Sequence, residues 1–495
     1  YTPREIVHYM CEQSLVNYLA TELKGKVSKE DLEKLIKIGE NVVELEAVSI
    51  SKEDNPEYGG GYKRLLPDSI KEFVRQIDNK LATIKVCDPA IGSGAFPVGM
   101  MNVIVKARMV LSSYLKDKNR TLYTFKRDCI QNSLYGVDID PGAVEIAKLR
   151  LWLSLVVDED NIKQIKPLPN LDYKIMQGNS LLEEFEGIKL FDEKLLEAPV
   201  INVSMFEADN QRILKLQSEL LQKYYIKNPE WLRNKTADRP NEVRSLEKQL
   251  YELMKKKKKV ASEDYEQKDL FSDVAPSSQI RDELESLHKR FFNETNGTKK
   301  KDLKERIEKL EWELIETTLK EQNKTSALKK LEEFKRSNTK TFFLWKLNFA
   351  DVFEEKGGFD VVIGNPPYGF RNVLTPAEKL HFRKVENIEF SSGDSAELFC
   401  KKSFNNLVRQ DGILTFIIPK KSLYGDAWEG FRKDYWIKYN LKFLLDSSKA
   451  FHDVLLEANA FGLVKNSDTE DIKPSYLKKV DAVFQFASMS KDDVF

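Results

Sequence analysis

The residues best suited to chemistry in this sequence are the five from Gly364 to Tyr368, which read Gly-Asn-Pro-Pro-Tyr. They follow a mostly apolar run at 359–363 that is typical of a buried parallel strand. Two prolines keep the backbone extended, so neither a ladder nor a helix continues there. The Asn365 side-chain oxygen and the Pro366 carbonyl can accept the hydrogens of an exocyclic amine, and Tyr368 offers a stacking face. This clamp suits a flipped-out nucleobase; the alternative interpretation is a strand-ending Pro-Pro turn.

A second candidate site is the segment 84–96, whose pattern predicts a strand, a glycine-rich turn and a helix. Gly92 and Gly94 allow the backbone to approach a ligand closely. The spacing is not G-x-G-x-x-G, and no Gly-Lys-Ser/Thr follows, so a dinucleotide or P-loop site is disfavoured. Asp88 at the strand end, beside a turn of small residues, instead suits a ligand that carries an ammonium group and no phosphate.

Two acids follow the next apolar strand. Asp138 stands at the tip of the second strand of a βαβ unit, where it can accept hydrogen bonds from ribose hydroxyls. Asp140 precedes Pro141, so we expect it to cap the next helix, with the proline at the first helical position. At the start of the chain, Thr2 is expected to cap a helix that has Pro3 at its first position.

In this order, the motifs resemble those of the γ-class amino-methyltransferases, which use S-adenosylmethionine (SAM) to methylate adenine N6 in DNA. The matching segments are Tyr1–Val7, Asp88–Gly94, Asp138, Gly178–Leu181, Asn365–Tyr368, Gly412–Pro419 and Lys449–Phe451. Each motif is weak alone, whereas the full set in one order is specific. The resemblance implies an α/β fold, a Rossmann-like SAM-dependent methyltransferase sheet with helices on both faces.

The resemblance also implies a role for each matching residue. The implied cofactor-binding residues are Thr2, Asp88, Pro89, Ala90, Gly92, Gly94, Asp138, Ile139, Asn179 and Pro367. The implied catalytic residues are Asn365, Pro366 and Tyr368, and the implied contacts to the substrate base are Tyr368 and Phe451. Asn179 departs from the family pattern, because an acid is common at the position that contacts the SAM adenine. No metal is implied.

The more specific resemblance is to the methylase part of large type IIG restriction-modification enzymes, or of related phage-defence methylases. Those proteins carry the Tyr-Thr-Pro opening mid-chain and a target-recognition domain after the last core strand. This sequence begins at Tyr1-Thr2-Pro3 and ends soon after Phe484. We therefore expect an excised catalytic domain whose partner is double-stranded DNA, bound through a recognition domain largely absent from the chain.

Composition fits a soluble intracellular protein with reduced thiols, and the resemblance implies the cytoplasm of a bacterium or archaeon. The 495 residues suffice for two or three structural units and a sizeable core. Lys plus Arg and Asp plus Glu both number 79, so the formal net charge is zero, whereas complete DNA-binding proteins are often basic. The four cysteines and four histidines lack disulfide or metal-ligand spacing. No run approaches a membrane span, and no signal peptide opens the sequence.

Residues 199–340 interrupt the predicted core with a stretch rich in Lys, Glu, Leu and Gln. Heptad spacing at 246–253 and at 303–314 indicates an antiparallel, coiled-coil-like helical hairpin. We expect these helices to project from the sheet rather than to add an αβ layer. The predicted organisation is a methyltransferase core in two halves, 1–198 and 341–480, a long α-helical insertion at 199–340, and the start of a recognition region at 481–495.

The expected reaction is methyl transfer from SAM to the N6 amino group of an adenine flipped out of double-stranded DNA. Asn365 and the Pro366 carbonyl would localise the lone pair of that nitrogen, mainly by positioning and preorganised electrostatics. Methylation of cytosine N4 is a chemical alternative, because N4 is also an exocyclic amine. Methylation of cytosine C5 is disfavoured, because the sequence lacks a Pro-Cys dipeptide. The rival functions are a glutamine-amide protein methyltransferase and a non-catalytic SAM-binding module.

Overall fold

The computed structural model describes residues 2–37, 66–115, 120–157, 171–185, 188–189, 297–321, 342–369, 391–448, 457–466, 475–480 and 483–488, with a few isolated positions between them. The strands are β1 (Val86–Asp88), β2 (Leu134–Asp138), β3 (Ile175–Gln177), β4 (Glu184–Phe185), β5 (Ile188–Lys189), β6 (Phe359–Gly364), β7 (Val408–Pro419), β8 (Asn440–Ser448), β9 (Ala458–Val464), β10 (Ser475–Val480) and β11 (Val483–Ser488). The helices are α1 (Arg4–Leu23), α2 (Lys29–Lys37), α4 (Asp68–Glu72), α5 (Val74–Thr83), α6 (Ala95–Ser112), α7 (Leu122–Asn132), α8 (Pro141–Val156), α13 (Gly297–Glu321), α15 (Trp345–Asn348), α16 (Ala350–Lys356), α18 (Ser395–Lys402), α19 (Lys421–Tyr424) and α20 (Glu429–Phe431).

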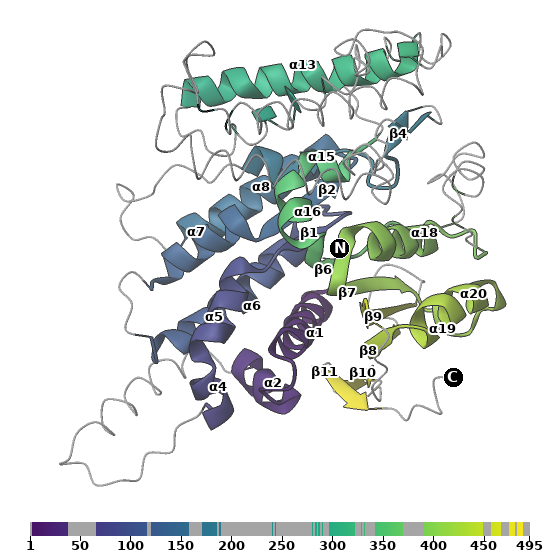
Figure 1. Cartoon of the computed structure of the whole chain (residues 1–495). Coiled ribbons are helices and arrows are strands. Elements are labelled where there is room, and N and C mark those ends of the chain that lie inside the picture. The colour runs from purple at the N-terminus through teal and green to yellow at the C-terminus, as the bar shows by residue number, and fades with distance from the viewer. Residues whose placement is uncertain are drawn as a thin grey trace.

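One large sheet organises the molecule (Figure 1). Its nine strands lie in the order β11-β10-β8-β9-β7-β6-β1-β2-β3, and β4 pairs with β5 in a separate hairpin. Strands β3, β2, β1, β6 and β7 run parallel, while β9 is antiparallel to both β7 and β8. After β3 the chain returns to the other side of β1 as β6, so the strand order reverses between β1 and β6. Ligands of such sheets bind at the carboxyl ends of the strands at this switch point.

Side chains that alternate along the central strands supply two separate cores, one on each face of the sheet. Val86 and Val361 pack with helices α1, α2, α5, α6, α7 and α8 on the first face. Cys87 and Val362 point the other way and belong to a core that includes buried residues of α13, α15, α16 and α18. This arrangement confirms the predicted Rossmann-like sheet with helices on both faces.

Contrary to the expectation that no run approaches a membrane span, helix α6 is long and apolar enough, by length and composition, to cross a membrane. Most of that window is buried inside the protein, and the helix packs on α1, α7 and β1. These contacts are those of a core helix. The four cysteine side chains are also buried and unpaired, as the sequence predicts.

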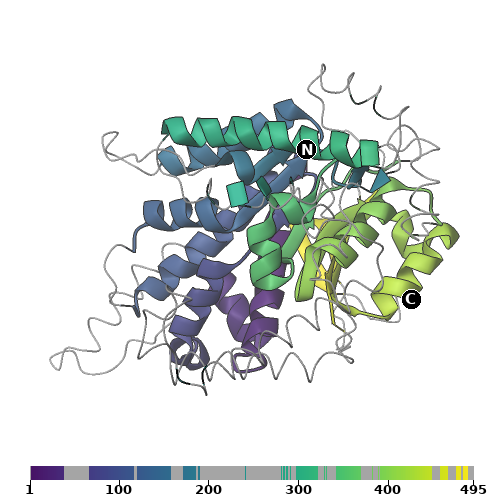
Figure 2. The same ribbon diagram turned by 45° about the horizontal axis from the view of Figure 1, so that its top comes forward.

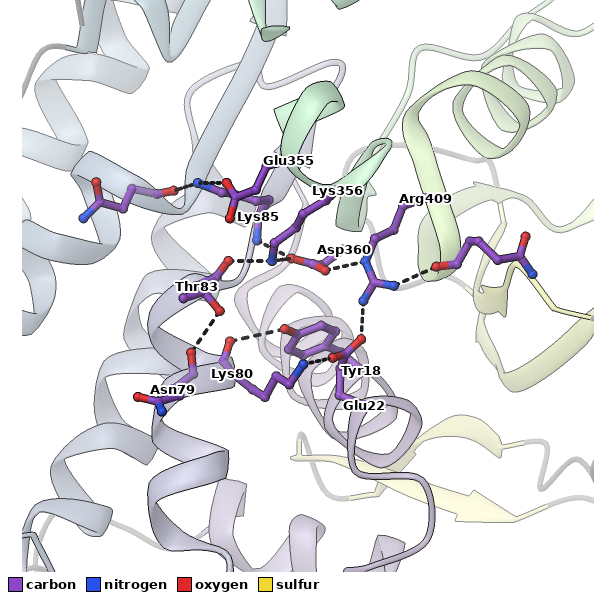
Figure 3. Close-up of polar contacts among 12 residues, drawn as sticks. Tyr18, Glu22, Asn79, Lys80, Thr83, Lys85, Glu355, Lys356, Asp360 and Arg409 are labelled. Atoms are coloured by element: carbon purple, nitrogen blue, oxygen red, sulfur yellow. Dashed lines mark hydrogen bonds and ion pairs between the residues drawn. The ribbon is translucent and has the colours of Figure 1, made fainter. Parts of the chain in front are cut away.

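A charged network ties the strands together at the amino-terminal edge of the sheet (Figure 3). The carboxylate of Asp360, which is 1% exposed, accepts hydrogen bonds from the Lys85 backbone N–H at 2.7 Å, Lys356 Nζ at 2.6 Å and Arg409 Nε at 2.5 Å. Arg409 also pairs with Glu22 of α1. The network therefore clamps α1, α16, β6 and β7 at the edge opposite the switch-point crevice.

Helix α13 is the main described part of the expected insertion, and it lies along one side of the molecule in both views (Figure 1, Figure 2). Ile307, Leu310 and Leu314 are buried, in agreement with the heptad spacing of this segment. The spacing at 246–253 lies outside the described residues. The domain boundaries, the hairpin and the recognition region at 481–495 stay predictions, and β11 within that last range pairs with β10.

Candidate active site

Two of the predicted motifs meet at the carboxyl ends of β1 and β6. The strands pair in parallel, with Val86 opposite Val361 and Cys87 opposite Val362. The next residues along each strand are therefore neighbours, and a Cβ built on Gly364 would lie only 2.6 Å from Asp88 Oδ1. A glycine is required at this position for the two loops to approach each other, a requirement that the sequence alone did not reveal.

The Asn365 side chain is held in the crevice through its amide nitrogen, and its amide oxygen lacks a hydrogen-bond donor among the described residues. Its Nδ2 donates to Thr2 Oγ1 at 3.1 Å. Its Oδ1 is buried and accepts no hydrogen bond from the part of the chain that the structure describes. A buried acceptor left unsatisfied costs about 1–3 kcal/mol, so a ligand N–H at this place would be favoured.

The expectation that Thr2 caps the first helix is wrong. Helix α1 begins at Arg4, its N-cap residue is Pro3, and no side chain caps it. The Thr2 hydroxyl instead accepts the hydrogen bond from Asn365, so it serves the crevice rather than the helix terminus.

The rest of the Asn-Pro-Pro-Tyr segment is supported from the start of α18. Ser395 Oγ donates to the Pro367 carbonyl at 2.7 Å, and the Gly369 N–H donates to Asp394 Oδ1 at 3.1 Å. Pro366 is buried, and Tyr368 is half-buried against the second core. Burial, together with the nearby Asp394 carboxylate, raises the pKa of Tyr368, so its phenol stays neutral.

Sequence reasoning did not single out the two residues that support this segment, Asp394 and Ser395. Asp394 and Glu397 form a recognisable helix-start pattern, and Asp394 does cap α18 by accepting the Ala396 N–H at 3.0 Å. The pattern predicts a cap but not the contact of that cap with a loop 25 residues earlier.

The buried carboxyl of Asp88 is the most perturbed acid of the crevice. Oδ1 accepts the Ala90 N–H at 3.0 Å, while Oδ2 is buried without a partner. Burial, with a smaller contribution from the carboxylate of Asp138, raises the pKa of Asp88 to about 8. The carboxyl is therefore mostly protonated at neutral pH, and a cationic donor beside Oδ2 would favour its ionised form.

The glycine-rich turn is fixed by its neighbours in the shape that the sequence predicts. Gly92 and Gly94 have φ values of +51° and +81°, which L side chains rarely adopt. Asp138 Oδ2 accepts the Gly92 N–H at 2.8 Å, and Asp138 Oδ1 accepts the Asp140 N–H at 3.0 Å. A carboxylate offers about four lone pairs, so Asp138 keeps capacity for further donors. The neighbouring Ile139 is 58% exposed, an apolar surface at the mouth of the crevice.

Asp140 caps helix α8 as predicted. Its Oδ1 accepts the Gly142 N–H at 2.8 Å, and Pro141 occupies the first helical turn. The cap directs α8 away from the crevice and leaves Asp138 and Ile139 at the edge of the sheet.

The loop after β3 is the third segment of the crevice. Asn179 Oδ1 accepts the Leu181 N–H at 3.0 Å in a local turn that an aspartate can form equally well, so the turn does not explain the departure from the usual acid. Ser180 Oγ donates to the Pro89 carbonyl at 2.5 Å, which joins this loop to the glycine-rich turn. Lys402 Nζ donates to the Leu181 carbonyl at 2.5 Å. The direct contact of Asn179 with a cofactor stays a prediction, and Lys402 is a supporting residue that sequence reasoning missed.

The structure thus brings together most of the predicted site at one edge of the sheet. Thr2, the 88–94 turn, Asp138, the loop after β3 and Asn365 all belong to it. Phe451 lies outside the described residues. Among those described, no group of three or more His, Cys, Asp or Glu side chains lies close enough together to hold a metal ion.

Comparison with known proteins gives two curated relatives. The chain is 31% identical over 395 residues to "Putative type II restriction enzyme and methyltransferase RM.MjaORFECS2P" of Methanocaldococcus jannaschii, covering 76% of this chain and 29% of that protein. It is 26% identical over 145 residues to the type II restriction enzyme and methyltransferase RM.Eco57I of Escherichia coli, covering 26% of this chain and 14% of that protein. The chain therefore spans less than a third of the length of either relative.

Solved structures with similar folds include the type I restriction enzyme EcoKI M protein, with a TM-score of 0.32, 11% identity, and coverage of 93% of this chain and 64% of that one. The type IIL restriction-modification enzyme MmeI in complex with DNA gives a TM-score of 0.39, 10% identity, and coverage of 90% and 38%. At such scores, the fold assignment depends on the sheet topology itself. The family model of the Eco57I restriction-modification methylases matches residues 132–451, which include β2, the loop after β3 and the Asn-Pro-Pro-Tyr segment. The chain therefore belongs to the Eco57I restriction-modification methylase family.

Proposed function

We propose that this chain transfers a methyl group from SAM to the N6 amino group of adenine in double-stranded DNA, and that the base is flipped out of the helix to react. We further propose that it acts in a bacterial or archaeal cytoplasm as the modification part of a restriction-modification or phage-defence system. The observation that carries the proposal is the buried Asn365 Oδ1 that lacks a donor, at the switch-point crevice of a methyltransferase sheet. Family membership supports methyl transfer in general.

The crevice fits SAM at three places. Asp88 Oδ2 lacks a partner, and the amino group of SAM would supply one. Gly92 and Gly94 expose backbone close to the ligand, and Asp138 retains lone pairs for the ribose hydroxyls. Ile139 is exposed where an adenine ring would pack. When bound, SAM supplies the methyl group as an electrophile.

The protein's own contribution to the reaction is to hold the target amine and to orient its lone pair. Asn365 Oδ1 and the Pro366 carbonyl would accept the two amine hydrogens, which withdraws the nitrogen lone pair from conjugation with the ring. The Thr2 hydroxyl fixes the Asn365 amide, and Ser395 fixes the Pro367 carbonyl, so the clamp is formed before the substrate arrives. Tyr368, neutral and half-buried, would stack on the flipped base.

The experiment that tests this function is the substitution Asn365→Ala, measured by transfer of a radiolabelled methyl group to cognate duplex DNA by the full-length protein. Loss of the amide should lower the rate by about 10²–10³-fold, as for removal of one preorganised polar group. SAM affinity should stay near the wild-type value, because the proposed partner of the Asn365 amide is the target amine and not the cofactor. Asn466→Ala, beyond the far end of β9, is the matched control and should retain activity.

The alternatives give different outcomes. Label that appears on a protein glutamine instead of on DNA would support the glutamine-amide methyltransferase. SAM binding without transfer to either substrate would support the non-catalytic module. A near wild-type rate of adenine methylation by Asn365→Ala would show that the clamp is assigned wrongly.

A further inference from the structure

A groove lies between helices α1, α6, α7 and α8, on the face of the sheet that carries the first core. One face of α6, from Ala95 to Lys106, forms its floor. Its volume of about 840 Å³ is large enough for several units of a polymer rather than for a single ion. One end of the groove reaches the crevice, because Thr2 lines the groove and also binds Asn365.

The groove is positively charged. Arg4, Lys106, Lys126 and Arg150 line it, and none of its described lining residues is acidic. His8 also lines the groove, but its Nε2 lies 3.1 Å from the Glu12 carboxylate, so it adds no uncompensated positive charge. The four cations give the groove a local excess of positive charge in a chain whose formal net charge is zero.

Three of the four cations, Arg4, Lys106 and Arg150, can meet an anionic ligand, whereas Lys126 Nζ already donates to the Ser154 carbonyl at 3.1 Å. Arg150 Nη1 binds the carbonyl of Ser93 at 3.0 Å and its hydroxyl at 3.1 Å, two neutral acceptors that leave the charge uncompensated. In the described part of the chain, neither Arg4 nor Lys106 has an ion pair or a hydrogen bond from its side chain. Neither residue is buried.

The dimensions of the groove suit a nucleic-acid backbone. From Ala95 to Lys106, helix α6 rises about 16 Å at 1.5 Å per residue. A strand of duplex DNA presents one negative charge per nucleotide, so more than one phosphate fits this length. Apolar lining residues such as Val98 and Leu122 would also suit an acidic polypeptide. DNA is favoured because the groove ends at Thr2, which holds the amide assigned to the target base.

We propose that this groove binds the sugar-phosphate backbone of DNA beside the target nucleotide. The inference rests on the proposed function for the identity of the polymer, and it adds a contact made by the catalytic chain itself. Because phosphates carry no base identity, the contact supplies affinity and orientation without sequence preference.

The test measures binding of a labelled duplex of arbitrary sequence to the intact chain between 50 and 200 mM NaCl. Each phosphate contact contributes about 0.9 to the slope of log K against log salt, so the double variant Arg4→Gln/Lys106→Gln should lower the slope by about 1.8. Over this fourfold salt range, the wild type should then lose about 12-fold more affinity than the variant loses. Lys433→Gln, an exposed lysine outside the groove, is the matched control and should leave the slope unchanged. Thermal melts by circular dichroism verify that each variant is folded.

An unchanged slope in the double variant would overturn the proposal. So would a selective loss of binding to poly-glutamate with duplex binding intact, which would assign the groove to an acidic polypeptide. The methylation reaction is measured in a separate assay. In the binding assay, Asn365→Ala should keep the wild-type slope of log K against log salt. If the wild type fails to methylate DNA while the groove variants lower the slope, the proposed function fails and the groove stands.

Discussion

Asn365 and Asp88 each place one buried oxygen in the crevice without a hydrogen-bond donor. Each unmet acceptor costs about 1–3 kcal/mol, so both favour a ligand that brings N–H groups. The two oxygens differ in the donor that they prefer. The amide of Asn365 cannot ionise and suits a neutral amine, whereas the carboxyl of Asp88 can ionise and suits an ammonium group. One crevice can therefore hold a cationic cofactor and a neutral target without exchanging them.

On the proposed function, cofactor binding releases a proton from Asp88. With a pKa of about 8, raised mainly by burial, this carboxyl is mostly protonated at pH 7, and a ligand ammonium beside it favours the ionised form. SAM affinity should therefore rise with pH until about pH 8. Calorimetry at pH 7 in buffers of different ionisation enthalpy should show about 0.9 proton released per SAM bound. Asp88→Asn should abolish the release; an equal release in this variant would assign the proton to another group.

At the scale of single residues, the sequence predicts the groups that carry unusual chemistry and misses those that hold them. Asn365 and Asp88 stand out because a polar residue at the end of an apolar strand has few structural explanations. Gly364 and Ser395 act through contacts with segments far away in the sequence, and each is an ordinary residue in its local context. The local pattern around Thr2 predicts a helix cap, whereas the structure shows its hydroxyl accepting a hydrogen bond from the distant Asn365.

At the scale of elements, α18 connects the two halves of the crevice. Its first turn holds the Asn-Pro-Pro-Tyr segment through Asp394 and Ser395. Its last residue, Lys402, holds the Leu181 carbonyl in the loop after β3. That loop is joined in turn to the glycine-rich turn by Ser180. A rigid helix thus sets the separation between the segment assigned to the base and the loop assigned to the cofactor.

Lys402→Met should weaken SAM binding more than it affects the target base. Lys402 is 5% exposed and its ammonium group donates to a carbonyl, and hydrogen bonds of charged groups are worth about 1.5–3 kcal/mol. Calorimetry should therefore show SAM affinity lowered by roughly 10- to 100-fold, with a smaller change in the KM for DNA. Lys421→Met in α19 is the exposed control. Equal losses for cofactor and DNA would indicate general destabilisation instead of a positioning role.

Acid should destabilise the packing of the helices on the first face of the sheet. Two carboxylates of these helices, Glu22 in α1 and Asp78 in α5, have lowered pKa values. Burial opposes ionisation of Glu22, but its bonds with Lys80 and Arg409 outweigh burial and lower its pKa. Asp78 is likewise buried, and its bonds with Arg120 and other partners lower its pKa. Lowered values mean that this stability is present above the ordinary carboxyl range, near pH 4, and is lost as pH falls through the lowered values.

Urea unfolding between about pH 2 and pH 6 measures this effect as the pH dependence of the free energy of unfolding. Glu22→Gln should be less stable than the wild type at pH 6 and should lose less stability on acidification. Glu30→Gln, an exposed residue of α2, is the control. The assignment is wrong if Glu22→Gln shows the wild-type slope.

At the scale of the whole molecule, the strand order could be predicted only in part. The apolar runs at 84–88, 134–138 and 359–364 predict parallel strands, and the motif order places them in one sheet. Nothing local shows that β6 crosses to the far side of β1 or that β9 inserts antiparallel between β7 and β8. Such pairings join segments that are separate in the sequence, 275 positions apart for Val86 and Val361, and a periodicity does not encode which segments pair.

The heptad spacing of α13 likewise predicts its helix but not its packing partner. The sequence predicts that the helices of the insertion project from the sheet and do not add an αβ layer. The buried side chains of α13 belong to the same contiguous core as Tyr135 and Val362 of the sheet, and Trp312 meets Phe342 edge-on at 6.4 Å between ring centroids. Helix α13 is therefore connected to the methyltransferase core through the segment that leads back into β6.

Leu314→Ala tests whether this helix and the sheet unfold as one unit. Leu314 is 2% exposed, and truncation of a buried leucine costs about 2–5 kcal/mol. Because the core is contiguous, calorimetry should show one main transition shifted to lower temperature, and SAM should bind with lower apparent affinity at temperatures near that transition. Glu313→Ala, on the exposed side of the same helix, should leave the transition in place. A separate early transition in Leu314→Ala, with the main transition unmoved, would instead make the helix an independent arm and restrict the catalytic unit to the sheet and its flanking helices.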